Sequence, residues 1–366
     1  MTSASPRIEG IDAARGVALL GMMATHVLPL HTATGETVVG AVAAGRASAL
    51  FAVLVGVGIA LGSRAVDARS HLAAAAGLLV RALLIGLVGL VLVGLDPPVA
   101  VILTYYALLI LIAVPLLRAP WWLLAGGAVL ACVGAPVLSA VLRSGLPEGP
   151  GDQVGFAALA EPASALRELL VTGYYPVLTW TTYLLAGLAV GRLDLRSSRT
   201  GWGLLGGGAV LAAATAVLSS VLLAAGGLDA IGGPRELLVQ RYGTVPTDTW
   251  WWLAVELPHS GTPLDLAHTT GCALAVIGAA LLVARAAPWA VVPFAAVGAV
   301  TLTLYSLHVA TLAVLGGGGL STYLWHVGWC LAIGLVVRVT GVRGPAEAVL
   351  SGASRAARTA ARTMVR

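Results

Sequence analysis

Residues 72–94 read LAAAAGLLVRALLIGLVGLVLVG, a run of 23 residues that carries a single charge, Arg81. An α-helix needs about 20 mostly apolar residues to cross the hydrocarbon core of a bilayer, so this run predicts a membrane-spanning helix. Comparable runs recur along the chain. They predict ten spans, at about residues 14–31, 47–63, 72–94, 98–117, 120–142, 174–191, 202–226, 267–284, 290–315 and 322–340.

The composition also indicates a chain that is solvated mainly by lipid. Of the 366 residues, 58% are hydrophobic and 10% are charged, whereas soluble domains carry about 25% charged residues. We therefore expect an all-α, polytopic integral membrane protein, and the classes of soluble globular protein are excluded. All 21 positive residues are Arg, and the chain has neither Lys nor Asn. Because the codons of Lys and Asn are AT-rich, this bias suggests a GC-rich bacterial genome, and hence a bacterial plasma membrane.

The arginines predict the orientation of the spans. If ten spans alternate from the N-terminus, sixteen arginines fall on the N-terminal side and five on the other side. Positive residues collect on the cytoplasmic side of membrane proteins. We therefore expect both termini in the cytoplasm, so the basic overall charge says nothing about nucleic acid.

The predicted organisation is one transmembrane domain over 1–342, with long outer loops at 143–173 and 227–266. The remaining residues, 343–366, form a basic cytoplasmic tail. Its arginines are spaced three to four apart and would form one stripe of a helix. Such a stripe is expected to lie on anionic lipid headgroups. The stripe consists of Arg355, Arg358, Arg362 and Arg366.

The histidines gather on one side of the predicted membrane. Ionisable groups inside a membrane are costly, so they are candidates for function by default. Any one of them could instead be a structural histidine that is hydrogen-bonded between helices. Six of the seven map to the outer half of the spans or to the outer loops: His26, His31, His259, His268, His308 and His326.

The first span combines three of these polar groups. Asp12 and Arg15 open it, and His26 follows eleven residues after Arg15. Eleven residues make about three helical turns, so Arg15 and His26 share one face and lie about 16 Å apart along the axis. Arg15 could hold an anionic donor, with Asp12 as its partner, while His26 could act as a general base. The alternative interpretation is an anchoring arginine and a packing histidine.

Several segments resemble one known family. RIEGIDAARGVALLGM, at residues 7–22, resembles the opening of the heparan-α-glucosaminide N-acetyltransferase-like (YeiB-like) membrane proteins, which belong to a wider transmembrane acyltransferase superfamily. YPVLTW at 175–180 with the later Gly187 and Gly191-Arg192, the segment 298–305, and GPAE at 344–347 resemble further parts of that family. The resemblance covers nearly the whole chain.

The related acyltransferase-3 proteins place an Arg, ten residues and a His in the first span. Arg15 and His26 match this spacing, and Tyr305 with His308 resembles their late Y-x-x-H segment. In the heparan enzyme an Asn takes the place of His26, and the working histidine lies further on, where His31 is the nearest equivalent here. The resemblance thus leaves His26 and His31 as alternative catalytic residues, and we favour His26.

This resemblance implies transfer of an acyl group, acetyl by preference, from acetyl-CoA or another acyl-CoA to an extracytoplasmic glycan or glycolipid. No metal is expected. The bilayer and the acceptor are the expected partners, and the chain could act alone or as a homodimer. The candidate site is formed by His26, His31 and His308 for catalysis, Asp12 and Arg15 for the donor, and His259, His268, Tyr305 and Trp252 for the acceptor. Trp252 belongs to a Trp triplet at 250–252, which could instead be part of an interfacial aromatic belt.

Two other classes of function fit the same features. A proton-coupled transporter or flippase for an envelope precursor could use the polar face of the first span. Such proteins often contain paired repeats, and the two halves of this chain show no convincing repeat, which counts mildly against it. The other class is a non-catalytic scaffold that retains the fold.

Overall fold

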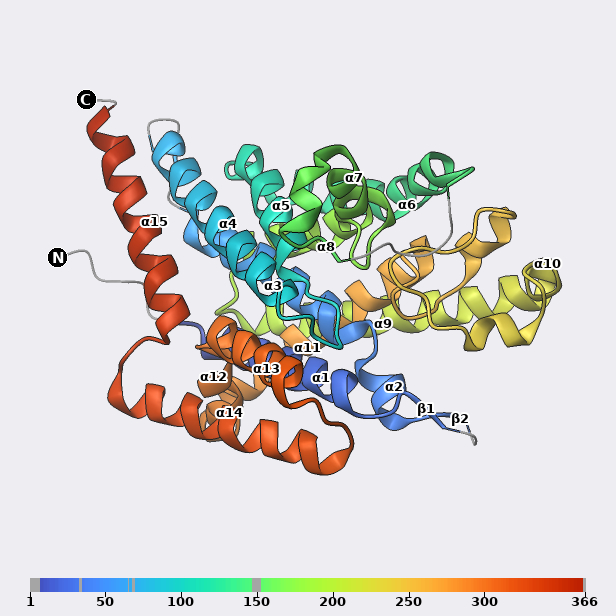
Figure 1. Ribbon diagram of the computed structural model, residues 1–366. Helices are drawn as coiled ribbons and strands as arrows, with labels where there is room; N and C mark the ends of the chain where they lie inside the picture. The colour runs from blue at the N-terminus through green and yellow to red at the C-terminus, as the bar shows by residue number, and fades with distance from the viewer. Residues whose placement is uncertain (1–6, 33–34, 65, 68–69, 147–152, 365–366) are drawn as a thin grey trace.

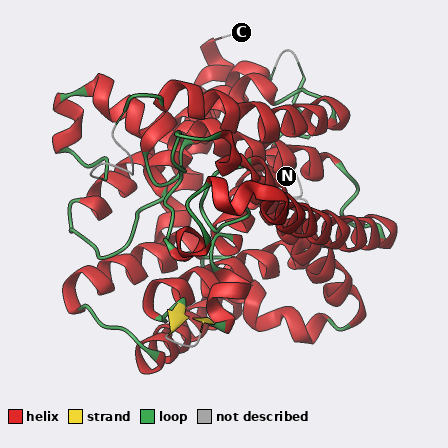
Figure 2. Ribbon diagram, turned by 90° about the vertical axis from the view of Figure 1, so that its right-hand side faces the viewer, coloured by secondary structure: helices red, strands yellow, loops and turns green. Residues whose placement is uncertain are grey.

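The computed structural model describes all residues except 1–6, 33–34, 65, 68–69, 147–152 and 365–366. Part of the predicted loop 143–173 and the last two residues of the tail therefore lie outside the described residues. Within the described ranges the fold is helical, as expected, and one hairpin supplies the β structure (Figure 2). Its strands, β1 (His31–Thr32) and β2 (Gly35–Glu36), are antiparallel, with His31 opposite Glu36.

Helical segments make up most of the described chain. The α-helices are α1 (Glu9–Val27), α2 (Val38–Ala43), α3 (Arg46–Gly62), α4 (His71–Val93), α5 (Leu103–Ala113), α6 (Trp121–Arg143), α7 (Pro162–Arg167), α8 (Val177–Arg192), α9 (Ser198–Leu222), α10 (Leu228–Ala230), α11 (Pro263–Ala286), α12 (Pro288–Gly298), α13 (Thr301–Leu315), α14 (Leu320–Thr340) and α15 (Pro345–Met364). The 3₁₀ and π segments are η1 (Val114–Leu116), η2 (Ala157–Ala160), η3 (Glu168–Thr172), η4 (Leu223–Gly227), η5 (Pro234–Leu238) and η6 (Trp250–Ala254).

Six of these helical segments are long and apolar enough to cross a membrane, counting the described residues only. The bent pair α12 and α13, whose axes differ by 60°, makes a seventh if it counts as one span. The other three predicted spans coincide with α1, α5 and α8. Of these, α5 has 11 residues and α8 has 16, while the first turns of α1 carry Glu9, Asp12 and Arg15. Length and composition therefore support six or seven spans directly.

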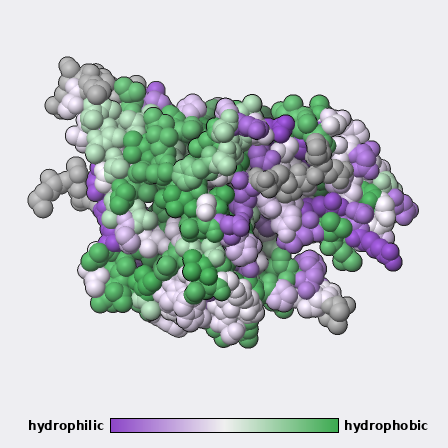
Figure 3. All heavy atoms as spheres, viewed as in Figure 1, coloured by the Kyte–Doolittle hydropathy of each residue, from purple (hydrophilic) through white to green (hydrophobic). Residues whose placement is uncertain are grey.

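The two ends of the helix bundle differ. Both termini lie at one end, and the β1–β2 hairpin and α10 lie at the opposite end (Figure 1). In the same view, apolar side chains cover much of the surface, and hydrophilic residues gather on the side of α10 (Figure 3). This distribution agrees with an apolar belt in lipid and a polar end outside it.

Glycines bring the central helices into close contact. A Cβ atom on Gly16 of α1 would lie 2.0 Å from the Phe294 carbonyl oxygen of α12, and one on Gly298 would lie 1.7 Å from the Asp12 carbonyl oxygen. Gly187 of α8 approaches the Val53 carbonyl of α3 in the same way, at 2.0 Å. Small residues permit such close backbone packing between membrane helices. The α1–α12 contact therefore determines where the polar face of α1 lies.

The break between α12 and α13 is stabilised by the C-terminal segment. The N–H groups of Leu302 and Thr303 donate to Glu347 Oε1 at 2.8 and 3.1 Å, and the Thr303 hydroxyl donates to Oε2 at 2.6 Å. A carboxylate in this position satisfies the free N–H groups of a helix start and interacts favourably with its dipole. Glu347, the last residue of the GPAE segment, thereby ties α15 to the helix that carries Tyr305 and His308.

The tail is a helix, α15, that packs on the bundle along α4. The Ser354 hydroxyl donates to the Gly77 carbonyl at 2.9 Å, and the Arg358 side chain lies directly over Gly77. The predicted basic stripe lies on this helix from Arg355 to Arg362, and Arg366 is outside the described residues. The structure adds that part of this stripe faces other helices of the protein.

Candidate active site

Helix α1 carries polar groups along one face, as its spacing predicts. The Arg15 Nη1 atom lies 2.8 Å from Asp12 Oδ1, so the two side chains form an ion pair near the start of the helix. His26 lies near its other end. Two cavities open along this face, one around Arg15 and one around His26.

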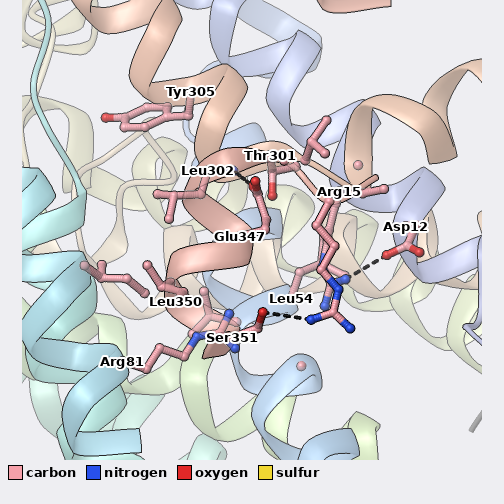
Figure 4. A pocket seen from close by; sticks show the side chains of 18 of the residues that line it. Asp12, Arg15, Leu54, Arg81, Thr301, Leu302, Tyr305, Glu347, Leu350 and Ser351 are labelled. Atoms are coloured by element: carbon pink, nitrogen blue, oxygen red, sulfur yellow. Dashed lines mark hydrogen bonds and ion pairs between the residues drawn. The ribbon is translucent and has the colours of Figure 1, made fainter. Parts of the chain in front are cut away.

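The arginine-lined cavity lies around the first turns of α1 and has a volume of about 770 Å³, within the range of ordinary ligand sites. Figure 4 shows Arg15 and Arg81 at this cavity, with Tyr305, Glu347 and Ser351 also on its wall. Seven arginines and three carboxylates line it, which leaves an excess of positive charge. These are Arg7, Arg15, Arg81, Arg338, Arg343, Arg355 and Arg358, with Glu9, Asp12 and Glu347.

The histidine-lined cavity lies around the far end of α1 and has a volume of about 450 Å³. His26 and His259 are its two imidazoles. The remaining polar side chains that line it come from α1, α3 and the loops of that end. They are Thr25, Ser48, Gln153, Tyr174, Tyr175, Gln240 and Tyr242.

The two cavities meet at Met22, which lines both. Met22 precedes His26 by one helical turn, about 6 Å along the axis. A second link runs through Tyr106, on the wall of the arginine-lined cavity, whose hydroxyl donates to the Ser48 carbonyl at 3.4 Å. Ser48 lines the histidine-lined cavity. The two cavities thus share a wall at Met22.

Three histidines form a continuous hydrogen-bonded chain at this level. His26 Nδ1 lies 3.0 Å from His308 Nε2, and His308 Nδ1 lies 2.9 Å from His326 Nδ1. The rings of His26 and His308 are stacked, with their centroids 5.2 Å apart. His308 and His326 are fully buried, while His26 is partly exposed and faces the cavity. The arrangement places His26 at the accessible end of the chain.

His259 lies on a loop at the wall of the histidine-lined cavity. Its backbone has a φ of +60°, a conformation that His and Asn tolerate better than most residues. The Ser48 hydroxyl donates to the Gly45 carbonyl at 2.9 Å and lies 3.2 Å from His259 Nε2, so it accepts a hydrogen bond from that nitrogen. Burial, together with the nearby Arg46 charge, lowers the pKa of His259 to about 4. His259 is therefore neutral at neutral pH.

We expect this half-buried, neutral histidine to make the protein less stable in acid. Below pH 6.5 the unfolded chain binds a proton at His259, whereas the folded chain does so only near pH 4. The free energy of unfolding should therefore fall as the pH is lowered through this window, by up to about 1.4 kcal/mol per pH unit. His259→Asn, which keeps a polar side chain suited to positive φ, should lose part of this dependence. Thermal unfolding of the wild type and of His259→Asn at pH 7.5 and pH 5 measures this dependence. An equal loss of stability in the two proteins would contradict the expectation.

Two of the residues predicted for the acceptor lie in other surroundings. His268 lines neither cavity; its Nδ1 atom donates to the Ala212 carbonyl at 3.0 Å, and its Nε2 atom lies 3.5 Å from Glu256 Oε1. Arg46 lies 3.5 Å from the same carboxylate. Burial raises the pKa of Glu256, and Arg46 opposes this shift. His268 is thus part of a separate ionic cluster beside the loop that holds His259.

Trp252 is buried in a small core that it forms with Ile231, Val245 and Val255. Its indole N–H donates to Asp248 Oδ1 at 2.8 Å, and the Arg241 guanidinium lies 4.6 Å from the centre of its ring. Gln240 and Tyr242, on either side of Arg241, line the histidine-lined cavity. Trp252 therefore supports the wall of the cavity instead of lining it.

The other predicted residues divide between the cavities and the surface. Asp12, Arg15 and Tyr305 line the arginine-lined cavity, and Tyr305 Oη accepts a hydrogen bond from the Ile102 N–H at 3.4 Å. His308 lies behind His26, as described above. His31 is exposed in β1 and lines neither cavity. The structure thus brings His26, His308 and His259 to one region and leaves His31 and His268 outside it.

Four residues that are central to the geometry were not predicted as site residues from the sequence: Ser48, Arg81, His326 and Glu347. His326 was among the outer histidines, so its place on a late span was a usable signal. Arg81 is the single charge in the span 72–94, which was a second signal. Ser48 has no such signal, because a serine in an apolar helix is common between packed membrane helices.

The family model described as heparan-α-glucosaminide N-acetyltransferase, catalytic, matches residues 7–223. The match covers more than half of the chain and includes α1 to α9. The chain belongs to this family. The resemblance noted in residues 7–22 is thereby confirmed, and a search of curated proteins finds no significant match to this chain.

Membership of the heparan-α-glucosaminide N-acetyltransferase family implies a membrane acetyltransferase with acetyl-CoA as the acetyl donor. The arginine-lined cavity suits such a donor, because phosphate and pyrophosphate groups bind to arginine by charge-assisted, often bidentate hydrogen bonds. The family match includes Arg15, His26 and Arg81. It ends before His308, His326 and α15. The roles of these residues are therefore argued from the structure alone.

Proposed function

We propose that the protein transfers an acetyl group from acetyl-CoA to a hydroxyl or amine of an extracytoplasmic carbohydrate, such as a glycan or glycolipid of the bacterial cell envelope. The observation that carries this proposal is the meeting of two cavities at Met22, one turn from His26. The arginine-lined cavity is suited to the polyanionic donor. The histidine-lined cavity, with its neutral hydrogen-bonding side chains, is suited to a sugar.

His26 is the general base of the proposed reaction. If its Nδ1–H donates to His308 Nε2, and the His308 Nδ1–H donates to His326 Nδ1, every contact in the chain of rings is satisfied. His26 Nε2 is then unprotonated and available to a substrate. In this arrangement His308 and His326 are positioning residues, which hold the tautomer and orientation of the His26 ring.

The chemistry balances without a further reactant. His26 Nε2 takes the proton of the acceptor O–H or N–H while the oxygen or nitrogen forms a bond to the thioester carbonyl carbon. The C–S bond then breaks, and His26 returns the proton to the departing CoA sulfur. An acetyl group held transiently on His26 is the alternative order of the same bond changes.

The orientation follows from the same proposal. We infer ten spans, with α1, α5 and α8 completing those that length and composition support, and both termini in the cytoplasm. The arginine-lined cavity then opens toward cytoplasmic acetyl-CoA, because Arg7 and Arg355 lie near the two termini. Single cysteines introduced at exposed Arg362 and at exposed Thr32 should react with an impermeant maleimide from opposite sides of spheroplasts. Equal labelling of both from outside would contradict this orientation.

A transfer assay tests the function itself. Purified protein in detergent or nanodiscs receives acetyl-CoA labelled in its acetyl group together with an extract of cell-envelope glycans. We expect label in the glycan fraction and free CoA thiol in equal amount. Thiol release without a labelled acceptor would indicate hydrolysis, and the absence of both would contradict the proposal.

A transporter or flippase remains the second candidate, and one observation favours it. The pair α12 and α13 is a broken helix at the wall of a cavity, a feature of many transporters. Against this, Glu347 caps the break with three hydrogen bonds, which makes it a fixed element. Flux of a labelled envelope precursor into proteoliposomes without consumption of acetyl-CoA would favour transport.

A further inference from the structure

Three arginines of the arginine-lined cavity form no hydrogen bond or ion pair through their guanidinium groups with the part of the chain that the structure describes. Arg7 and Arg15 lie near Asp12, Arg338 pairs with Glu9 at 2.7 Å, and Arg343 donates to the Ser351 hydroxyl at 2.9 Å. The three remaining guanidinium groups have no ion pair or hydrogen-bond partner among the described residues. They are Arg81, Arg355 and Arg358.

These three groups come from two helices that pack together. Arg358 lies over Gly77, which is one turn before Arg81 on the same face of α4. A side chain on Gly77 would displace Arg358, since a Cβ atom there would lie 2.6 Å from Arg358 Nε. The Ser354 hydroxyl holds α15 in register by its hydrogen bond to the Gly77 carbonyl. The packing of α15 on α4 therefore brings these positive charges together at one wall of the arginine-lined cavity, although like charges repel.

One face of α15 lines the arginine-lined cavity. The residues that line it are spaced by one helical turn, so they share a face: Glu347, Leu350, Ser351, Ser354, Arg355 and Arg358. Arg362, one turn further, is exposed and does not line the cavity. The family match ends at residue 223, so it assigns no role to α15.

We propose that α15 supplies the phosphate-binding wall of the donor cavity, with Arg355 and Arg358 of α15 and Arg81 of α4 binding the phosphate groups of the CoA nucleotide. This inference rests on the proposed function and adds to it how the site recognises the acetyl donor. A CoA thioester carries several negative charges at its nucleotide end and an uncharged pantetheine arm that leads to the thioester. The three arginines line the cavity that surrounds the first turns of α1, whereas Met22 and His26 lie toward the other end of α1. The cavity therefore selects thioesters by their nucleotide and rejects the same acyl group on an uncharged arm.

Binding measurements on the full-length protein in neutral phosphatidylcholine nanodiscs test this wall. The probes are CoA, 3′-dephospho-CoA and pantetheine, and the variants are R355Q, R358Q and the double variant. Arg362→Gln is the matched control, because it removes the same charge from the same helix outside the cavity. We expect CoA affinity to fall about tenfold for each arginine and about a hundredfold for the pair, since a charge-assisted hydrogen bond contributes on this scale. The affinity for pantetheine should be the same in all variants. The R362Q control should bind CoA as tightly as the wild type does.

Three results of these measurements would count against the inference. Unchanged CoA affinity in the double variant would overturn it, as would an equal loss for CoA and pantetheine, which would indicate a disturbed fold. Anionic lipid is the other source of phosphate: if the double variant loses only its association with phosphatidylglycerol vesicles and keeps CoA affinity, α15 binds headgroups instead. If the wild type binds CoA by these arginines but transfers no acetyl group, the proposed function fails and the inference stands.

Discussion

Replacing His26 by Gln is expected to lower the rate of acetyl transfer by about 10²–10⁴-fold, the usual contribution of a positioned general base. Gln occupies a similar volume and keeps a group that can hydrogen-bond to His308 Nε2, the atom that lies 3.0 Å from His26 Nδ1 in the wild type. It has no basic nitrogen, so it cannot accept the acceptor's proton. Affinity for CoA should not change, because the arginine-lined cavity does not include His26.

The controls separate chemistry from folding. His31→Gln changes an exposed histidine of β1 and should leave the rate within about twofold, since surface substitutions are usually small in effect. Thermal unfolding and CoA binding of both variants, measured beside the transfer rate, show whether each protein is intact. A normal rate in His26→Gln with a large loss in His31→Gln would reverse the assignment and make His31 the working histidine.

His326→Gln should give an intermediate result. His326 is buried and touches His308, which in turn touches His26, so it acts on the reaction only through the orientation of the His26 ring. We expect the maximal rate to fall while the KM for acetyl-CoA stays the same. The dependence of the rate on pH should also shift, because the tautomer of His26 is no longer fixed. A fall in CoA affinity without a change in the pH profile would indicate a purely structural role.

Much of the helical layout could be predicted because lipid requires long apolar runs. Each of the ten predicted runs coincides with a helix or with the bent pair α12 and α13. The bend itself was not predicted, since the carboxylate that caps it, Glu347, reaches the start of α13 from 45 residues away in sequence. Hydropathy within a window contains no information about such a distant cap.

The candidate site was predictable in part, for a similar reason. Arg15 and His26 lie on one helix, so their spacing alone places them on one face. The contact of His26 with His308 joins residues 282 positions apart, and no periodicity reveals it. His31 and His268 map to the same half of the predicted spans, yet they lie outside the cavities, because depth in a membrane does not determine which way a side chain points.

The close contact between α1 and α12 provides the second large prediction. Gly16→Ala adds one methyl group, 2.0 Å from the Phe294 carbonyl oxygen, where the obstacle is backbone and cannot rotate away. The two helices must separate, and we expect a loss of about 3 kcal/mol in the free energy of unfolding, the upper end of the usual cost of overpacking. Because α1 also carries Arg15 and His26, transfer activity should fall in whatever protein remains folded.

Gly207→Ala is the matched control for this substitution. Gly207 lies in the middle of α9, is exposed, and has open space where its Cβ atom would be. The same methyl group should there be neutral or stabilising by about 0.5–1 kcal/mol, because alanine favours the helix over glycine. Thermal unfolding of both variants in the same detergent measures the difference. Equal stability of the two would mean that α1 and α12 do not cross at Gly16, and the position of His26 relative to His308 would then have no support from the packing of these helices.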